Sequence, residues 1–279
     1  MRLHEVVVEG LPAWLDTARL LGDGDWRKTT RPDGTVQAIA RLSEPLAADL
    51  AARLRGVGLG GEKLAVRVVP ALSREAVREA RTEDARRRRE TTPGFSRRGT
   101  KLDDEGRVSL TPELLADALA AELAASGAHT VLDACAGAGG NAIAFARAGL
   151  AVVAVERDAS RLALLAHNAR VYGVEARITC VHGDAITAAR ERSADVLFVD
   201  PPWGTDYDRE RMTLDALPPL AEVLEAVRAR AAFGRVIAKV PPSFAVSSLP
   251  AVQVRAVFGE ARGDFRRVKL LLVELPPRA

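Results

Sequence analysis

Two acids stand around a glycine-rich turn in the middle of the chain. Asp133 closes a short apolar run, and Gly137 and Gly139 follow it within a few residues. Glu156 ends the next apolar run. Glycines let the backbone turn sharply and approach a ligand closely. At the carboxyl edge of a parallel sheet, such a turn is typical of nucleotide binding, with the second acid accepting hydrogen bonds from ribose hydroxyls.

The spacing leaves two classes of cofactor open. Gly137-x-Gly139-x-x-Ala142, with an acid about 20 residues further on, also satisfies the dinucleotide fingerprint. Asp133 stands four residues before the first glycine. A carboxylate there repels a pyrophosphate but attracts the α-ammonium group of S-adenosylmethionine (SAM). We therefore predict SAM as the cofactor, with Asp184 placed after the third strand to accept a hydrogen bond from the adenine amino group.

The sequence Asp-Pro-Pro-Trp at 200–203 is the most informative stretch, because it follows the apolar run 196–199 directly. A strand there delivers Asp200 and Trp203 to the same sheet edge as the cofactor. Pro201 and Pro202 stiffen the loop and remove two backbone donors, which leaves a cluster of acceptors. Such a cluster suits the amino group of a base, and stacking on Trp203 is worth about 1–3 kcal/mol. A structural strand end with a core Trp is the competing interpretation.

Transfer of a methyl group to that amine needs little acid–base help. The sulfonium of SAM already carries an activated methyl, so the enzyme has to align and desolvate the two partners. The sequence accordingly has no convincing catalytic His or Cys. Its two cysteines, Cys135 and Cys180, and its four histidines follow no metal-ligand spacing, so we expect neither a disulfide framework nor a metal.

Basic residues concentrate in one segment of a chain whose formal net charge is +3. Between residues 86 and 101, seven Lys or Arg stand against one acid, Glu90, which gives +6 locally and −3 for the rest of the chain. A concentrated basic segment suggests a polyanionic partner, with a solvated charged helix as the alternative. We expect RNA contacts from the following residues: Arg86, Arg87, Arg88, Arg89, Arg97, Arg98 and Lys101.

The composition limits the class of protein. The chain has 279 residues, of which 48% are hydrophobic and 28% charged, and this excludes a disordered or collagen-like chain. No uncharged apolar run reaches the roughly 18–20 residues that cross a bilayer. An acid, Glu5, stands where a secretory signal would need its apolar core. We expect no targeting segment, no membrane and a cytoplasmic location.

The elements that must position these residues fall into two groups. The pattern of the first group predicts a βαββαβ unit, which is the order of a ferredoxin-like fold, and Asp33-Gly34 is expected to form a hairpin turn in it. Its strands and helices are expected over 3–8, 12–21, 26–30, 35–42, 46–54 and 63–69, and an exposed helix over 73–90 follows. RNA contact by this unit is a further expectation, although the aromatic base-stacking signature is absent.

From Ser109 onward, helices alternate with short β-branched strands. The expected strands span 130–133, 151–156, 176–181, 196–200, 235–240, 253–258 and 267–273. Helical segments between the earlier strands indicate an α/β fold with a doubly wound, mainly parallel, Rossmann-like sheet. The last two strands lack a helix between them and are predicted to form an antiparallel pair at an edge.

From about Phe95 to Asp206 the chain resembles the RNA cap guanine-N2 methyltransferases, the trimethylguanosine synthase family. The matching stretches are Phe95-Ser96-Arg97, Lys101–Gly106, Ser109–Glu113, Asp133–Asn141, Asn168–Gly173, Gly183-Asp184 and Pro201–Gly204. The resemblance implies that Thr111 and Pro112 contact SAM near its amino-acid end and that Glu156 binds its ribose. It also implies that Asp184 lies near adenine and that Trp203 stacks on the target guanine.

Two departures from the family move the expected substrate away from a cap. The family usually has Ser before Pro-Pro-Trp, where this chain has Asp200, which looks more like methyltransferases of guanine N2 in tRNA or rRNA, or of adenine N6. Arg107-Val108 replaces aromatic residues that would sandwich a cationic cap guanine. We expect a SAM-dependent guanine-N2 methyltransferase of structured RNA. The alternatives are an N6-adenine methyltransferase of RNA or DNA, and a non-catalytic RNA-binding protein.

These interpretations define the expected domains and site. Residues 1–72 are the ferredoxin-like α+β domain, 73–108 a basic helical linker, and 109–279 the class I methyltransferase domain. The residues expected to carry catalysis are Asp200, Pro201, Pro202 and Trp203. Those expected to bind the cofactor are Thr111, Pro112, Asp133, Cys135, Ala136, Gly137, Gly139, Asn141, Glu156, Arg157, Asp184, Ala185 and Asp200.

Overall fold

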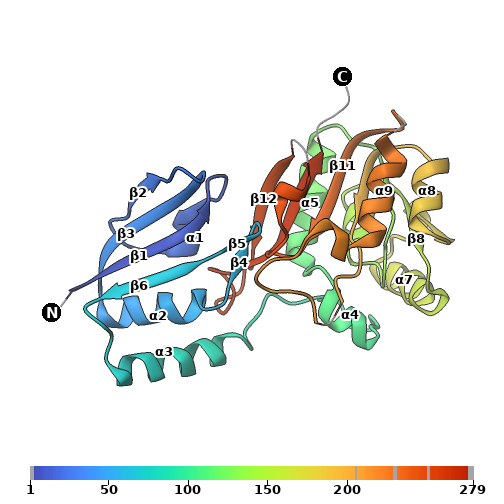
Figure 1. Cartoon of the computed structure of the whole chain (residues 1–279). Helices are drawn as coiled ribbons and strands as arrows, with labels where there is room; N and C mark the ends of the chain where they lie inside the picture. Colours follow the sequence, from blue (N-terminus) through green and yellow to red (C-terminus); the bar gives the residue numbers. More distant parts are fainter. Residues whose placement is uncertain (1–2, 205, 229–230, 250–251, 276–279) are drawn as a thin grey trace.

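The chain folds around two main sheets. The structure is a computed structural model, and it describes residues 3–204, 206–228, 231–249 and 252–275. Within these residues a four-stranded sheet forms near the N-terminus and a seven-stranded sheet over the C-terminal part. In Figure 1 the small sheet, with α2 and α3 beneath it, lies to the left, and the large sheet with its helices lies to the right.

The N-terminal unit has the predicted βαββαβ order. Its sheet runs β2-β3-β1-β6, and the strand pairs are antiparallel. The elements are β1 (Leu3–Pro12), α1 (Thr17–Leu21), β2 (Arg27–Thr30), β3 (Thr35–Ser43), α2 (Glu44–Leu54) and β6 (Ala65–Val69). The expected helix over 12–21 starts later, because Pro12 still belongs to β1 and Asp16 caps α1 through the amide of Ala18. The ferredoxin-like class stays a prediction.

The strand expected over 63–69 starts later, at Ala65, because Lys63 belongs to a short hairpin. The hairpin pairs β4 (Gly58–Leu59) with β5 (Glu62–Lys63). Gly60 and Gly61 form its turn with φ values of 65° and 90°. A two-residue turn with both φ values positive favours Gly-Gly. The sequence therefore carried a signal for this hairpin that the strand expectation overlooked.

Two helices connect the sheets. The first, α3 (Arg74–Arg87), is capped by Ser73, packs against α2 and ends three residues before the expected position. The second, α4 (Asp104–Ser109), is capped by Asp103, which accepts from the amide of Gly106.

The seven-stranded sheet confirms the mainly parallel Rossmann-like fold. Its order is β12-β13-β11-β10-β7-β8-β9, in which β11 to β9 run parallel and β13 runs antiparallel to both its neighbours. The expected antiparallel edge pair is therefore confirmed. The strands are β7 (Thr130–Asp133), β8 (Ala151–Glu156), β9 (Ile178–His182), β10 (Ala194–Val199), β11 (Phe233–Val240), β12 (Gln253–Phe258) and β13 (Val268–Leu275).

Helices cover both faces of this sheet because the side chains of its strands alternate. On β10, Val196 and Phe198 pack into one apolar cluster, and Leu197 and Val199 pack into the other. The first cluster takes side chains from α5 (Glu113–Ala125), α6 (Gly140–Arg147) and α7 (Ala159–Tyr172). The second takes them from α8 (Ala185–Glu191) and α9 (Pro218–Arg228), and it continues into the core of the N-terminal unit.

Three short 3₁₀ segments, Glu175–Arg177, Leu214–Ala216 and Val246–Ser248, lie in the connections of the described chain. A search of the described helices found none that is both long enough and apolar enough to cross a membrane.

Candidate functional site

Charged side chains meet where the parallel strands end. Asp133 ends β7, Glu156 ends β8, Asp184 follows β9 and Asp200 follows β10. The chain runs from β7 outward through β8 and β9, and then returns to place β10 on the other side of β7. Ligands of open α/β sheets bind at such a switch point. Asp133 and Asp200 therefore occupy the position where the fold favours a ligand.

Asp133 is a buried acid without a close hydrogen-bond partner, although the backbone amide of Cys135 is near enough to lower its pKa. Its side chain is 0% exposed, and neither carboxylate oxygen has a hydrogen-bond partner in the described part of the chain. Burial, together with the negative charge of Asp200, raises the pKa of Asp133 to about 8. A buried polar group that stays unpaired is costly. A cationic ligand group placed beside Asp133 would remove that cost.

Glu156 holds the glycine turn by its backbone. Its Oε2 accepts from the amide of Gly137 at 2.8 Å, and its Oε1 accepts from the amide of Asp158 at 2.9 Å. Gly139 adopts φ 97° at the N-terminus of α6, and a Cβ there would lie 2.9 Å from Leu165 Cγ. Each carboxylate oxygen has a second lone pair, so Glu156 still has acceptor capacity for a ribose hydroxyl.

The segment before α5 lies against the same turn. A Cβ on Gly140 would meet Leu110 Cδ1 at 2.7 Å and the carbonyl oxygen of Thr111 at 3.6 Å. Within the described residues, Thr111 Oγ1 and Asn141 Oδ1 are buried without partners. Together with Asp133, they offer a hydroxyl, an amide oxygen and a carboxylate around one glycine turn. These residues fit the ammonium and carboxylate end of SAM.

Asp200 is paired with a lysine that sequence reasoning missed. Lys239, on β11, donates to Asp200 Oδ2 at 2.7 Å and to the carbonyl oxygen of Ser109 at 3.1 Å, and it is 3% exposed. Asn141 Nδ2 lies 3.3 Å from the same Oδ2. Burial raises the pKa of Asp200, and the Lys239 ammonium partly offsets that rise. A lysine inside the apolar run 236–240 was the signal that could have found this pair.

Trp203 lies beside this ion pair and borders a hollow. The Lys239 ammonium stands 5.2 Å from the centre of the Trp203 ring, and Tyr207 meets that ring edge-on at 5.7 Å. The hollow has a volume of about 610 Å³. Its lining is Trp203, Gly204, Asp206, Tyr207, Asp208, Arg211, Met212, Thr213 and Ala216. The structure thus brings a flat aromatic ring to the edge of an open pocket, with the Asp200–Lys239 ion pair beside the ring.

The remaining residues predicted to bind the cofactor lie around the turn with different exposure. Asp184 is exposed and caps α8, with its Oδ1 accepting from the amides of Ile186 and Thr187. Ala136 and Ala185 are buried, and Arg157 is exposed. Burial and the neighbouring Asp133 raise the pKa of the Cys135 thiol, so it stays protonated.

The basic segment is only partly available to a partner. Arg87 pairs with Asp49 at 2.7 Å and with Glu83 at 3.0 Å, and Arg88 pairs with Asp84 at 3.0 Å. Arg97 donates to the carbonyl oxygen of Val171 and covers the Tyr172 ring. Arg86 has a longer contact of 3.8 Å with Glu83.

In contrast, three cations of this segment have no ion-pair partner among the described residues: Arg89, Arg98 and Lys101. The backbone of Lys101 is held in place, because its amide and carbonyl both bond to the buried Asn168 side chain. Nowhere in the described ranges do three His, Cys, Asp or Glu side chains form a group that could hold a metal.

Comparison with known sequences identifies a related family. Residues 128–223 match the model of the family described as RNA cap guanine-N2 methyltransferase. The trimethylguanosine synthase of Schizosaccharomyces pombe is 33% identical in an alignment of 119 residues that covers 39% of this chain and 49% of that protein. The chain thus spans about half the length of this curated relative.

Comparison with solved structures finds further similarities of fold. An RNA methyltransferase from Salinibacter ruber, in complex with S-adenosyl-L-homocysteine, is 18% identical with a TM-score of 0.41, over 61% of this chain and 95% of that one. A putative RNA methyltransferase from Pyrococcus horikoshii is 15% identical with a TM-score of 0.43, over 68% of this chain and 94% of that one. These similarities are similarities of fold.

The matched segment contains the glycine turn, Glu156 and the Asp-Pro-Pro-Trp loop, which are the residues on which the expectation of a SAM-dependent methyltransferase rests. The resemblance of this part of the chain to the RNA cap guanine-N2 methyltransferase family, whose cofactor is SAM, is therefore confirmed.

Proposed function

We propose that this chain is a SAM-dependent RNA methyltransferase that acts on the exocyclic N2 amine of a guanine in structured RNA such as tRNA or rRNA. The observation that carries the proposal is the meeting of the Asp200–Trp203 loop with the unpartnered carboxylate of Asp133 at one sheet edge. One acid faces the place for a cationic cofactor, and the other faces the place for an amine.

When bound, SAM supplies an activated methyl group. Asp133, Thr111 and Asn141 would hold its amino-acid end, since their unpaired polar atoms surround the turn. Glu156 would accept from its ribose hydroxyls, and Asp184 lies at the strand end expected to face adenine. The buried position of Asp133 excludes water from that end and strengthens its attraction for an ammonium group.

The Asp200 carboxylate is arranged to accept a hydrogen bond from an amine. Its Oδ2 is occupied by Lys239 and Asn141, whereas no described residue donates to Oδ1. Oδ1 can therefore accept from the target N–H and orient the nitrogen toward the methyl group. Trp203 supplies the stacking face for the base, and the prolines keep competing N–H donors away from the loop.

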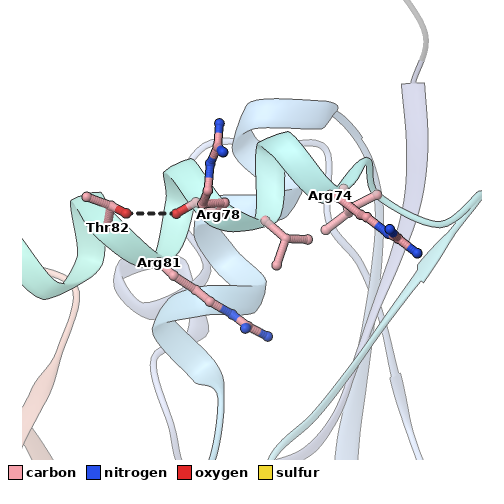
Figure 2. A pocket seen from close by; sticks show the side chains of 6 residues that line it. Arg74, Arg78, Arg81 and Thr82 are labelled. Atoms are coloured by element: carbon pink, nitrogen blue, oxygen red, sulfur yellow. Dashed lines mark hydrogen bonds between the residues drawn. The ribbon is translucent and has the colours of Figure 1, made fainter.

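An RNA partner is supported by a second basic surface, on α3. Arg74, Arg78 and Arg81 are exposed and have no ion-pair partner in the described chain. They border a hollow of about 450 Å³, which Figure 2 shows together with Thr82. In this view Arg74 and Arg81 extend to the same side of the helix, and Arg78 extends to the other. Arg74 and Arg81 are about two helical turns apart, and each exposed guanidinium group can pair with a phosphate oxygen.

The test of the reaction uses the full chain, tritiated SAM, and total tRNA or rRNA as methyl acceptors. Nucleoside mass spectrometry should find N2-methylguanosine in the product. An RNA with inosine in place of the target guanosine lacks the N2 amine and should accept no methyl. Transfer to the inosine RNA would contradict the N2 assignment, and no transfer to any nucleic acid would contradict the methyltransferase proposal.

The test of the RNA surface is the salt dependence of binding. Replacing Arg74, Arg78 and Arg81 by Gln should weaken RNA binding and flatten the salt slope by about 2, at about 0.7 per neutralised phosphate. Glu75→Gln with Glu79→Gln, on the same helix, is the matched control and should not weaken binding. SAM affinity should stay unchanged in both variants.

A second candidate is methylation of adenine N6, and Asp200 is the observation that favours it. Asp before Pro-Pro and an aromatic residue also serves that chemistry, because the adenine N6 amine presents the same hydrogens to a carboxylate. Finding N6-methyladenosine in place of N2-methylguanosine would select this candidate.

Both cysteines are free thiols, which is consistent with the proposed cytoplasmic location.

A further inference from the structure

The hairpin β4–β5 of the N-terminal unit lies against the loop that lines the pocket beside Trp203. In Figure 1 it lies between the small sheet and the large one. Its first strand is buried, with Leu59 0% exposed. The hairpin contacts two segments of the C-terminal part of the chain, 208–213 and 241–246. We call the first of these the pocket loop.

Backbone hydrogen bonds attach the hairpin to both segments. The amide of Gly58 donates to the carbonyl oxygen of Arg209 at 3.1 Å. The amide of Gly60 donates to the carbonyl oxygen of Pro242 at 2.8 Å, and its own carbonyl accepts from the amide of Val246 at 3.3 Å. Hydrogen bonds between main chains fix the position of a loop more closely than contacts between long side chains do.

Side chains of the pocket loop return to the hairpin. Arg211 Nη1 donates to the carbonyl oxygen of Gly61 at 2.8 Å, and Lys63 Nζ lies 2.8 Å from Glu210 Oε2. Arg211 also lines the pocket. The hairpin thus contacts a residue that faces the candidate base site.

The pocket loop is held to the neighbouring segment on its other side. The amide of Met212 donates to the carbonyl oxygen of Ser243 at 3.0 Å, and the amide of Ala245 donates to the carbonyl oxygen of Met212 at 2.7 Å. Ser243 Oγ donates to the carbonyl oxygen of Asp208 at 2.6 Å. The hairpin and the 241–246 segment therefore hold the pocket loop between them.

Two of the hairpin's glycines are required by this close packing. A Cβ on Gly58 would lie 1.9 Å from the carbonyl oxygen of Glu210, and a Cβ on Gly61 would lie 2.6 Å from Ala245 Cα. Both obstacles are backbone atoms, which cannot rotate away. The absence of a side chain at these two positions is what lets the hairpin reach the pocket loop.

We propose that the hairpin Gly58–Lys63 is part of the substrate site: it positions the pocket loop, so that the N-terminal unit sets the shape of the base pocket while leaving the SAM site untouched. The inference rests on the proposed function for the identity of the substrate. Gly58 and Gly61 are positioning residues, since they touch the loop and not the reacting atoms.

The test compares glycine variants in single-turnover methyl transfer with saturating SAM. Gly58→Ala and Gly61→Ala should raise the apparent KM for RNA about tenfold or more, because displacement of a positioning contact by about 1 Å can cost up to about 100-fold. The affinity for SAM should not change. Gly56→Ala is the matched control, since Gly56 also has a positive φ of 65° but meets nothing within 4 Å.

Hydrogen exchange gives a readout that does not depend on activity. The amide of Met212 should exchange faster in Gly58→Ala than in the wild type and in Gly56→Ala. Unchanged exchange and an unchanged KM would overturn the proposal. If the wild type transfers no methyl at all, the proposed function fails, while the exchange experiment still decides the role of the hairpin.

A second variant keeps the proposal testable if Gly58→Ala does not fold. Arg211→Met removes the hydrogen bond from Arg211 Nη1 to the carbonyl oxygen of Gly61 and should speed the exchange of the pocket-loop amides. Lys63→Gln is the control, since it removes only an exposed ion pair with Glu210 and should leave the exchange unchanged. No acceleration in Arg211→Met would count against the hairpin, and SAM binding serves as the check on folding in both variants.

Discussion

At the scale of single residues, the acid at the end of β7 determines how the site responds to pH. Asp133 is fully buried without a partner in the described chain, and burial beside Asp200 raises its pKa to about 8. Without a ligand it is therefore mostly protonated at pH 7. A ligand ammonium group favours the ionised form, so cofactor binding and loss of a proton are linked.

The affinity for SAM should therefore rise as the pH increases from 6 to 7.5, with release of up to about one proton per SAM bound. Calorimetric titration in buffers of different ionisation enthalpy measures both quantities. Asp133→Asn should bind SAM more weakly and should lose the pH dependence. A pH-independent affinity in the wild type would mean that Asp133 does not face the ammonium group.

Lys239 determines the charge state of the other acid. The groups that act on Asp200 are Lys239, Asn141, Asp133 and, further away, Arg161. Of the two cations, only Lys239 forms an ion pair with Asp200. Burial raises the pKa of Asp200 and Lys239 counteracts it, so removing the lysine leaves a buried acid whose pKa rises further. Asp200 accepts a hydrogen bond from the amine best when it is ionised.

Lys239→Met should therefore move the acid limb of the single-turnover rate profile to higher pH and lower the rate at pH 7 about tenfold or more. Arg235→Gln is the control on the same strand, because Arg235 pairs with Glu274 at the far end of β11. An acid limb that stays in place would show that Lys239 only packs against Trp203.

At the scale of elements, a buried aspartate fastens the connection between the sheets. Asp264 is 0% exposed and accepts from the amide and the hydroxyl of Thr92, both at 2.8 Å. It also accepts from the amide of Ala261 at 3.0 Å and pairs with Lys269 at 3.1 Å. This cluster anchors the chain after α3 to the turn between β12 and β13, and so places α4 and Thr111 near the glycine turn.

Asp264→Ala should lower the free energy of unfolding by about 3 kcal/mol, because it leaves several buried donors without their acceptor. Thr92→Val should cost about 2 kcal/mol, since it removes the hydroxyl that donates to Asp264 and accepts from the amides of Glu260 and Ala261. Urea unfolding measures both losses. Asp23→Ala, which breaks an exposed ion pair with Arg266, should leave stability unchanged. An Asp264→Ala effect as small as the control would contradict the anchoring role.

At the scale of the whole molecule, the two sheets share one apolar core. The cluster that contains Leu11, Leu50 and Leu59 of the N-terminal unit also contains Leu271 of the large sheet and Phe244 of the connection after β11. Arg19 and Arg53 extend this contact, since each donates to carbonyl oxygens near the β12–β13 turn, at Phe265 and Arg266. Units that share a core are expected to unfold together.

Calorimetry of the full chain should therefore show one unfolding transition, with the calorimetric and van't Hoff enthalpies in agreement. A saturating concentration of SAM should shift this single transition upward, since SAM binds the folded state. Two resolved transitions, of which SAM moves only one, would show that the units fold independently and that the shared core contributes little.

The sequence by itself determined the strands of the large sheet and the acidic residues that stand at the ends of those strands. The apolar runs 130–133 and 151–156 became strands with those bounds, and the glycine turn, Glu156 and the Asp-Pro-Pro-Trp loop follow strand ends as predicted. Strand formation and turn chemistry depend on neighbours along the chain, so a local reading suffices for them. The assignment of these residues to SAM and to an amine stays a prediction.

Only the tertiary structure decided which side chains meet. Lys239 reaches Asp200 across 39 positions, and Gly58 lies against a loop about 150 positions later. It also decided which arginines stay free: Arg87 and Arg88 are paired within the fold, whereas Arg74, Arg78 and Arg81 are not paired by any described residue. These outcomes depend on strand order and on the packing of the two sheets. A local sequence pattern does not determine either of them, because these contacts join residues that are far apart in the chain and close in space.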